Sequence, residues 1–145
     1  MKAKMTDSFV DTDVLIRLLA KDDPKKQAEA AALFQAVEAG KLTLAAPDTV
    51  IADAVYVLFS PRLYNIPRAE VAAMLTPLVR LPGFEIANRR ALLRALDLYA
   101  TTNLDFGDAL IVAAMEQQGS KIVYSYDTHF DRIPAITRRS PGRAS

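Results

Sequence analysis

The stretch that decides the fold is SFVDTDVLIRLL, residues 8–19. Its first three residues form a short, mostly apolar run that predicts a buried strand, and Asp11 follows at the carboxyl end of this strand. The next apolar residues predict a short helix over residues 14–20. Sites in open α/β sheets lie where the strands end, so Asp11 is the first candidate for a site residue.

Downstream of this stretch, short apolar strands alternate with helices. Strands are expected at residues 42–44, 84–86, 121–124 and 136–137, and helices at residues 24–39, 48–58, 67–80, 90–100 and 105–118. Asp48 is expected to cap its helix, and Pro77 to kink or shorten the helix in which it lies. The alternation predicts an α/β fold with a mostly parallel sheet. No linker or repeat divides the chain, so residues 1–145 are expected to form one domain.

The composition fits a packed globular domain and excludes several kinds of chemistry. The chain has 145 residues, of which 51% are hydrophobic and 24% charged, and it contains no cysteine. Disulfides, thiolate nucleophiles and cysteine-ligated zinc are therefore excluded. No apolar run is long enough to cross a bilayer, and residues 1–8 lack the apolar core of a signal peptide. A cytoplasmic protein without membrane contact is expected.

The charge balance gives nucleic acid no overall attraction, because the formal net charge is only +1. A local basic region would have to serve instead. The end of the chain, residues 136–145, is one candidate for RNA contact, and a flexible solubilising tail is an equally good interpretation. The arginines toward this end of the chain are Arg132, which precedes it, and Arg138, Arg139 and Arg143 within it.

Five aspartates stand at positions that are typical of a site. Asp11 and Asp127 follow predicted strands, where a lone aspartate is often only a turn former or a helix cap. Asp53 lies within an apolar helix, where a carboxylate is costly unless it is paired, although it could also mark the exposed edge of that helix. Asp105 and Asp108 lie in the first turn of the helix over 105–118, with Asp105 as the expected N-cap. Together these positions favour a functional carboxylate cluster.

Four carboxylates in one pocket would repel each other unless a cation lay among them. A set of oxygen ligands without cysteine indicates a hard ion, Mg²⁺ or Mn²⁺. The reaction typical of such an ion is hydrolysis of a phosphodiester by a metal-activated water. His129 is the only histidine. Ribonucleases that use two histidines are therefore excluded, and a surface role is expected for His129.

Three segments resemble the motifs of one known family. They are FVDTDVLIRLL (9–19), LDFGDALI (104–111) and YSYDTHFD (124–131). The first is similar to the opening of PIN-domain ribonucleases, in particular the VapC toxins of bacterial toxin–antitoxin pairs. The other two resemble the later acidic motifs of that family, in the same order and spacing. The resemblance implies a three-layer α/β/α sandwich with a central, mostly parallel sheet.

The resemblance also assigns roles to single residues. It implies that Asp11, Asp53, Asp108 and Asp127 are the catalytic, metal-binding acids. It implies that Thr12 and Ser125 are small hydroxyl residues near the pocket. Asp13 and Asp105 are expected to support the site as further acids beside it. Two residues depart from the family pattern: Asp53 stands where glutamate is usual, which shortens its reach, and Asp13 stands where asparagine or serine is usual, which adds negative charge or caps the following helix.

As for partners, the resemblance implies an RNA substrate, a cognate antitoxin and a homodimer. Two alternatives remain open from the sequence. One is a PIN-like module that binds RNA or protein without cutting. The other is a haloacid-dehalogenase-type phosphatase, in which Asp11 would be the nucleophile and Asp13 the general acid. The second leaves Asp53 unexplained.

Overall fold

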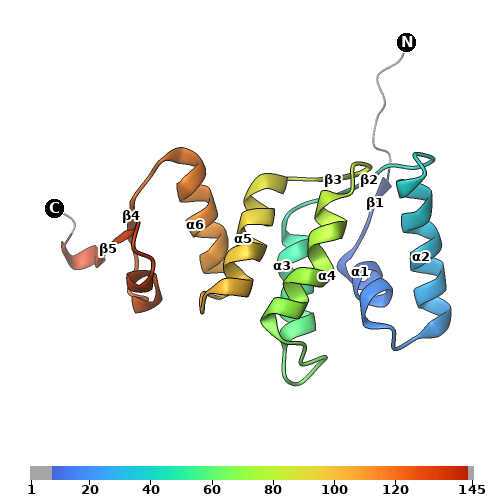
Figure 1. The fold of residues 1–145 in the computed structure, drawn as a ribbon, viewed down its shortest axis with the longest axis horizontal. Helices are drawn as coiled ribbons and strands as arrows, with labels where there is room; N and C mark the ends of the chain where they lie inside the picture. The colour runs from blue at the N-terminus through green and yellow to red at the C-terminus, as the bar shows by residue number, and fades with distance from the viewer. Residues whose placement is uncertain (1–7, 144–145) are drawn as a thin grey trace, which may run out of the picture.

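The chain is a mixed α/β protein of six α-helices and five short strands over residues 8–143, the part that the computed structural model describes (Figure 1). The strands are β1 (Ser8–Phe9), β2 (Leu44–Ala46), β3 (Phe84–Ile86), β4 (Ile122–Tyr124) and β5 (Thr137–Arg139). The helices are α1 (Thr12–Ala20), α2 (Pro24–Glu38), α3 (Thr49–Phe59), α4 (Arg68–Arg80), α5 (Arg89–Thr101) and α6 (Phe106–Gln118), with the 3-10 turns η1 (Thr128–Arg132) and η2 (Pro141–Arg143). None of the helices in this part of the chain is long and apolar enough to cross a membrane.

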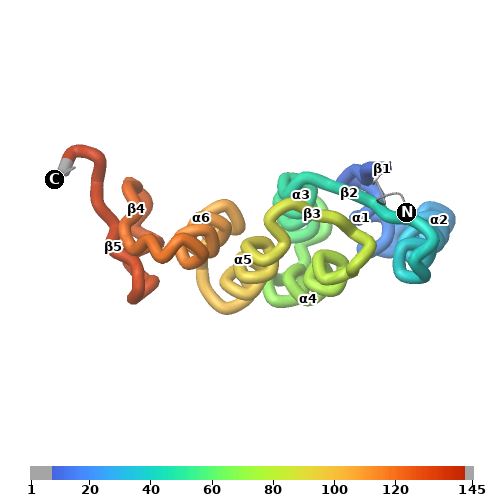
Figure 2. The backbone as a smooth tube through the Cα atoms, turned by 90° about the horizontal axis from the view of Figure 1, so that it is seen from above, coloured from blue at the N-terminus to red at the C-terminus, as the bar shows by residue number. Residues whose placement is uncertain are grey.

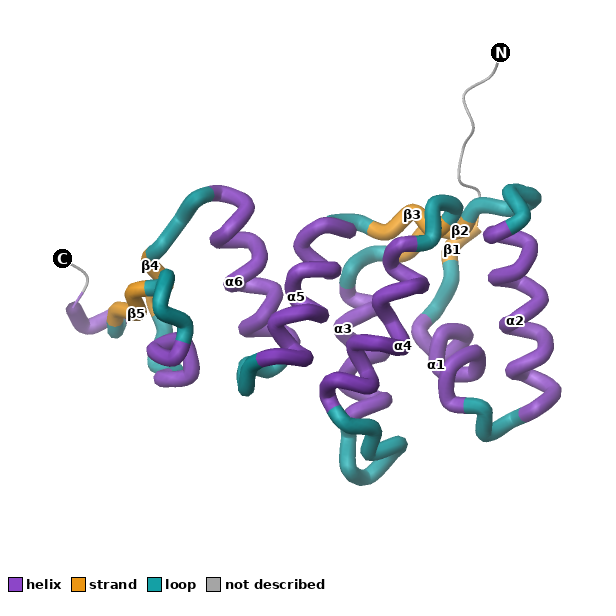
Figure 3. The backbone as a smooth tube through the Cα atoms, viewed as in Figure 1, coloured by secondary structure: helices purple, strands orange, loops and turns teal. Residues whose placement is uncertain are grey.

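All strand pairs are parallel, and they form two separate sheets. The first has the order β1-β2-β3, with Phe9 opposite Ala45 and Ala45 opposite Glu85. The second consists of β4 and β5, with Val123 opposite Arg138. Figures 2 and 3 place the two sheets toward opposite ends of the molecule, with α5 and α6 between them. The α/β class with parallel strands is confirmed and is consistent with the expected three-layer arrangement.

The helices begin where the sequence supplies a cap. Asp11 accepts a hydrogen bond from the Thr12 backbone N–H at 2.7 Å, so α1 begins at Thr12 rather than at the expected residue 14. Asp23 accepts one from Lys26 N–H at 3.1 Å, directly before a proline in the first helical position. Asp105 caps α6 as expected. Each cap satisfies a backbone donor that the helix leaves open.

One expected cap is wrong. Asp48 has helical backbone angles and makes no side-chain cap to α3; its carboxylate instead accepts a hydrogen bond from the Asn88 side chain at 2.9 Å. Nor does Pro77 shorten its helix, because α4 runs on to Arg80. Packing of the buried apolar side of α4 outweighs the one hydrogen bond that proline removes.

Two strands lie slightly later than expected. β2 spans 44–46 rather than 42–44, because its two alanines are fully enclosed between β1 and β3 despite a weak strand preference. β5 spans 137–139 rather than 136–137, so part of the expected basic tail pairs with β4.

Helices α3, α4, α5 and α6 supply most of the core, and one contact network fixes the start of α6. The rings of Phe59, Tyr99 and Phe106 stack edge to face with centroids about 6 Å apart. The Arg68 guanidinium lies 3.8 Å from the centre of the Tyr99 ring and donates to the backbone carbonyls of Tyr99 and Leu104. Helix α6, with its acidic first turn, is therefore held against α4 and α5.

The strands at two of the sheet edges are not buried, contrary to expectation. The Phe9 side chain is 72% exposed in β1, and Ile122 and Tyr124 in β4 are 42% and 48% exposed. The apolar runs do form strands, but within residues 8–143 these side chains keep a large share of their surface exposed to solvent.

Candidate active site

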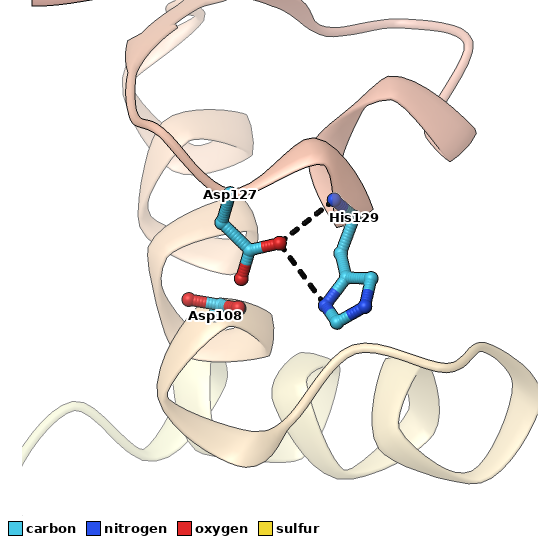
Figure 4. Close-up of side chains that lie close together, drawn as sticks. All are labelled: Asp108, Asp127 and His129. Carbon is cyan, nitrogen blue, oxygen red and sulfur yellow. Dashed lines mark hydrogen bonds and ion pairs between the residues drawn. The ribbon is translucent and has the colours of Figure 1, made fainter.

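The most concentrated group of ionisable side chains lies between the start of α6 and the turn after β4. It consists of Asp108 in the first turn of α6, Asp127 three residues after the end of β4, and His129 in η1 (Figure 4). One possible ligand atom from each of the three lies within 4.8 Å of the others. The sequence indicated Asp108 and Asp127 as site residues, and the structure brings these two together.

Local hydrogen bonds hold the backbone around these side chains. The Asp105 carboxylate accepts from Asp108 N–H at 2.8 Å, and the Ser125 hydroxyl oxygen accepts from Asp127 N–H at 2.9 Å. The Asp127 carboxylate accepts from His129 N–H at 2.8 Å and lies 3.1 Å from His129 Nδ1 (Figure 4). Asp105 and Ser125, both expected as supporting residues, therefore orient the two acids rather than join them.

The two acids have opposite electrostatic environments. Burial, followed by the negative charges of Asp105 and Asp127, raises the pKa of Asp108 to about 6. The backbone N–H of His129 lowers the pKa of Asp127, with a further contribution from the His129 side chain. Above the pKa of Asp108, two neighbouring carboxylates are negative together, and a cation would relieve their repulsion.

The donor set fits a divalent metal ion. One carboxylate oxygen of Asp108 is buried without any hydrogen-bond partner, which is costly unless a ligand meets it. Carboxylate oxygens are the ligands of Mg²⁺ and Mn²⁺, and a neighbouring imidazole is better suited to Mn²⁺ than to Mg²⁺. Asp108 and Asp127 would hold the ion, with His129 close enough to take part.

A second acidic group lines a hollow of about 600 Å³ between α1 and α3. Asp11, Thr12, Asp13 and Asp53 lie on its wall together with Tyr56. Thr12 donates its hydroxyl to the Val50 carbonyl at 3.5 Å and so ties the start of α1 to the start of α3.

Asp53 is exposed, and so is Tyr56 one turn later, so this part of α3 faces solvent. The interpretation that Asp53 is enclosed by apolar neighbours is wrong; the flanking apolar residues pack on the other side of the helix. Asp11 and Asp13 are exposed as well, Asp11 as the cap of α1 and Asp13 within its first turn.

The four predicted acids thus form two pairs within one chain. Asp11 and Asp53 line the hollow beside α1, whereas Asp108 in α6 and Asp127 after β4 lie close to each other (Figure 4). A further hollow of about 820 Å³ lies along α3 and reaches Asp105 at the start of α6. That all four aspartates act in one site stays a prediction.

His129 is the residue that sequence reasoning undervalued. It is half-exposed, as a surface residue would be, but its ring faces Asp127. The available signal was its place two residues after Asp127, where a short turn directs both side chains to the same side.

A scan of protein families matches the family described as "PIN domain" over residues 8–136. The match includes both acidic pairs and the segment around Asp13 that also resembled a phosphatase opening. A search of curated proteins gives no match to the chain. PIN domains are generally metal-dependent nucleases. The match extends over nearly all of the described chain, and the protein belongs to the PIN domain family.

Proposed function

We propose that the chain is an Mg²⁺- or Mn²⁺-dependent endoribonuclease whose active-site acids are Asp11, Asp53, Asp108 and Asp127. Membership of the PIN domain family supports a nuclease. The observation that carries the proposal is the meeting of Asp108 and Asp127, with an unpartnered carboxylate oxygen between α6 and β4.

The residues divide the work as follows. The carboxylates would bind the ion, and Asp105 and Ser125 would keep Asp108 and Asp127 in place through the backbone. When bound, such an ion supplies an activated water for phosphodiester hydrolysis. His129 would favour the ionised form of Asp127 and so the metal-binding state.

The test is cleavage of RNA by purified protein that has been stripped with EDTA and reloaded with Mg²⁺ or Mn²⁺. We expect cleavage only with metal, and at least about a 100-fold loss in Asp108→Asn, since even indirect metal partners cost up to this much. Asp97→Asn is the matched control. Asp97 is an exposed acid on α5 that forms an ion pair with Arg94. In Asp97→Asn, Arg94 keeps its other ion pair, with Glu116.

Two outcomes would overturn the proposal that the chain is a nuclease. In one, the reloaded protein cuts none of a broad set of transfer, ribosomal and messenger RNAs. In the other, Asp108→Asn cuts as fast as Asp97→Asn. RNA binding without cutting would then favour the non-catalytic module.

We further propose that the nuclease is the toxin of a toxin–antitoxin pair, acting as a homodimer on cytoplasmic RNA. The resemblance of residues 9–19 and 124–131 to VapC toxins supports this role. Expression of the wild-type chain should arrest bacterial growth, expression of Asp108→Asn should not, and a small protein encoded beside the gene should restore growth. Equal growth with both chains would contradict the toxin role.

A further inference from the structure

A small hollow adjoins the cluster of Asp108, Asp127 and His129. It has a volume of about 270 Å³ and lies between the loop after α5 and the turn η1. His129 lines this hollow, and the Nδ1 edge of its ring faces Asp127 (Figure 4). A ligand in the hollow would therefore lie directly beside the two acids.

Local contacts fix the backbone on both sides of the hollow. In the loop after α5, the Thr102 hydroxyl oxygen accepts a hydrogen bond from Leu104 N–H at 3.2 Å. In η1, His129 N–H donates to the Asp127 carboxylate at 2.8 Å, and Phe130 anchors the turn in the core with 1% of its surface exposed. The side chains that line the hollow thus stand on backbone that is ordered before a ligand binds.

Arg132 gives the hollow a positive charge that no acid neutralises. The neighbouring acid, Asp131, accepts hydrogen bonds from Arg138 at 2.9 and 3.3 Å. Arg132 lines the hollow, is exposed, and forms no ion pair within residues 8–143. Asn103 is exposed in the loop after α5 and adds a side-chain amide donor. A guanidinium and an amide around a small hollow are suited to binding an anion.

The position of the hollow indicates which anion it would bind. In an RNA strand whose cut phosphate lies at Asp108 and Asp127, the next phosphate is one nucleotide away and has to pass beside the same acids. Arg132 offers it a cation there. Pockets for drug-sized ligands have volumes of about 300–1,000 Å³, so a hollow of about 270 Å³ suits a single phosphate with its sugar better than a larger ligand.

We propose that Arg132, with Asn103 beside it, binds the RNA phosphate adjacent to the one that is cut. This inference rests on the proposed function for the cut itself, whereas binding at the hollow can be measured without cleavage. A contact to the backbone has no base preference, so this subsite sets the register of the strand and does not select a sequence.

The first test measures the binding of fluorescent single-stranded RNAs in EDTA to chains that carry Asp108→Asn, which prevents cutting and removes one repelling charge. Adding Arg132→Met keeps the length of the side chain and removes its charge. We expect affinity to fall about tenfold, the lower end for a hydrogen bond from a charged group, and equally for RNAs of different sequence. The slope of log affinity against log salt should decrease by about 0.7, the value for one phosphate on a single strand.

Arg90→Met in the same background is the matched control. Arg90 is an exposed arginine in the first turn of α5, about 16 Å along this helix from Thr101, which lines the hollow. This separation exceeds the screening length of about 8 Å at physiological salt. Arg90→Met should therefore bind RNA as the background does. Equal binding by Arg132→Met and Arg90→Met would overturn the proposal.

The second test removes the charge from the RNA instead of the protein. A methyl group replaces one oxygen of a single phosphate beside the cut. With Mn²⁺, this change at one of the two neighbouring phosphates should lower kcat/KM of the wild-type chain about tenfold. It should have little further effect on Arg132→Met, because both changes remove the same contact. Mn²⁺ binding to Arg132→Met, measured by calorimetry, should equal that of the wild type.

The outcomes separate this inference from the proposed function. Cleavage by the wild type with losses that simply multiply when both changes are combined would overturn the phosphate subsite alone. RNA that binds through Arg132 but is never cut by the wild type would overturn the nuclease alone. No binding of RNA by either the wild type or the Asp108→Asn chain would overturn both.

Discussion

Arg68 is the side chain whose removal should most clearly loosen the start of α6. Its guanidinium is half-buried, donates to the Tyr99 carbonyl at 3.0 Å and to the Leu104 carbonyl, and lies over the Tyr99 ring. Arg68→Met keeps the length of the side chain and removes all of these interactions. The backbone carbonyls of Tyr99, near the end of α5, and of Leu104, in the following loop, then lose their donor.

The size of the loss follows from these contacts. A hydrogen bond from a charged group contributes about 1.5–3 kcal/mol, and a partly exposed cation–π contact about 0.5–1 kcal/mol. Water can reach part of this half-buried site and replace some of the lost bonding. We therefore expect Arg68→Met to lower the free energy of unfolding by about 3 kcal/mol, a large share of the about 5–15 kcal/mol typical of a domain. Arg68→Lys can reach only one carbonyl at a time and should lose about half as much.

The assay is urea unfolding followed by circular dichroism, with Arg80→Met as control. Arg80 is exposed on the same helix, so its replacement should change stability by less than about 0.5 kcal/mol. Because Asp108 lies four residues beyond Leu104, Arg68→Met should also weaken Mn²⁺ binding measured by calorimetry on the folded protein. A loss below about 1 kcal/mol, or no difference from Arg80→Met, would refute the view that Arg68 secures α6.

Three further predictions concern pH and packing. In EDTA and above pH 6, Asp108→Asn should melt at a higher temperature than wild type, because ionised Asp108 destabilises the wild-type fold. The difference in melting temperature should shrink as the pH falls from 6 toward 4. A difference that does not depend on pH would contradict the raised pKa of Asp108. Leu92→Ala should cost about 2–5 kcal/mol in urea unfolding, because Leu92 is fully buried, and more than Leu93→Ala. Tyr64→Phe should lower the melting temperature most at neutral pH, because the Tyr64 hydroxyl lowers the pKa of Asp22 by donating to its ionised form; the loss should shrink as the pH falls below the ordinary pKa of Asp22 toward its lowered value. A loss that does not change with pH would exclude this origin.

Local features of the fold could be predicted from the sequence because their causes are local. Asp105 caps α6 and Gly119 ends it with a left-handed backbone, as their residue types favour. The pairing of strands has no such local cause. Nothing in IVY at 122–124 distinguishes a central strand from an edge strand, so the exposure of Ile122 could not be foreseen.

In the candidate site too, some features could be predicted from the sequence and others could not. Asp108 was predictable because its place in the first turn of α6 and its apolar successors are both visible in the sequence. The exposure of Asp53 was not, since it depends on which side of α3 packs against the rest of the chain. The role of His129 depends on the turn after β4, whose geometry is fixed by backbone hydrogen bonds that the Ser125 hydroxyl and the Asp127 carboxylate accept.

Charge repulsion is a physical reason for Asp11 and Asp53 to lie apart from Asp108 and Asp127 when no metal ion is bound. Two ionised carboxylates whose oxygens lie within 4.8 Å, as in the Asp108 cluster, repel by about 3 kcal/mol or more at an effective dielectric constant of about 20. Four ionised aspartates in one pocket would contain six pairs of like charges, so the repulsion would be several times larger. A divalent ion reverses the sign of this balance, because each carboxylate then gains more from the ion than it loses to its neighbours. Mn²⁺ should therefore raise the melting temperature of the wild-type chain, EDTA should reverse this gain, and Asp108→Asn should show little or none of it.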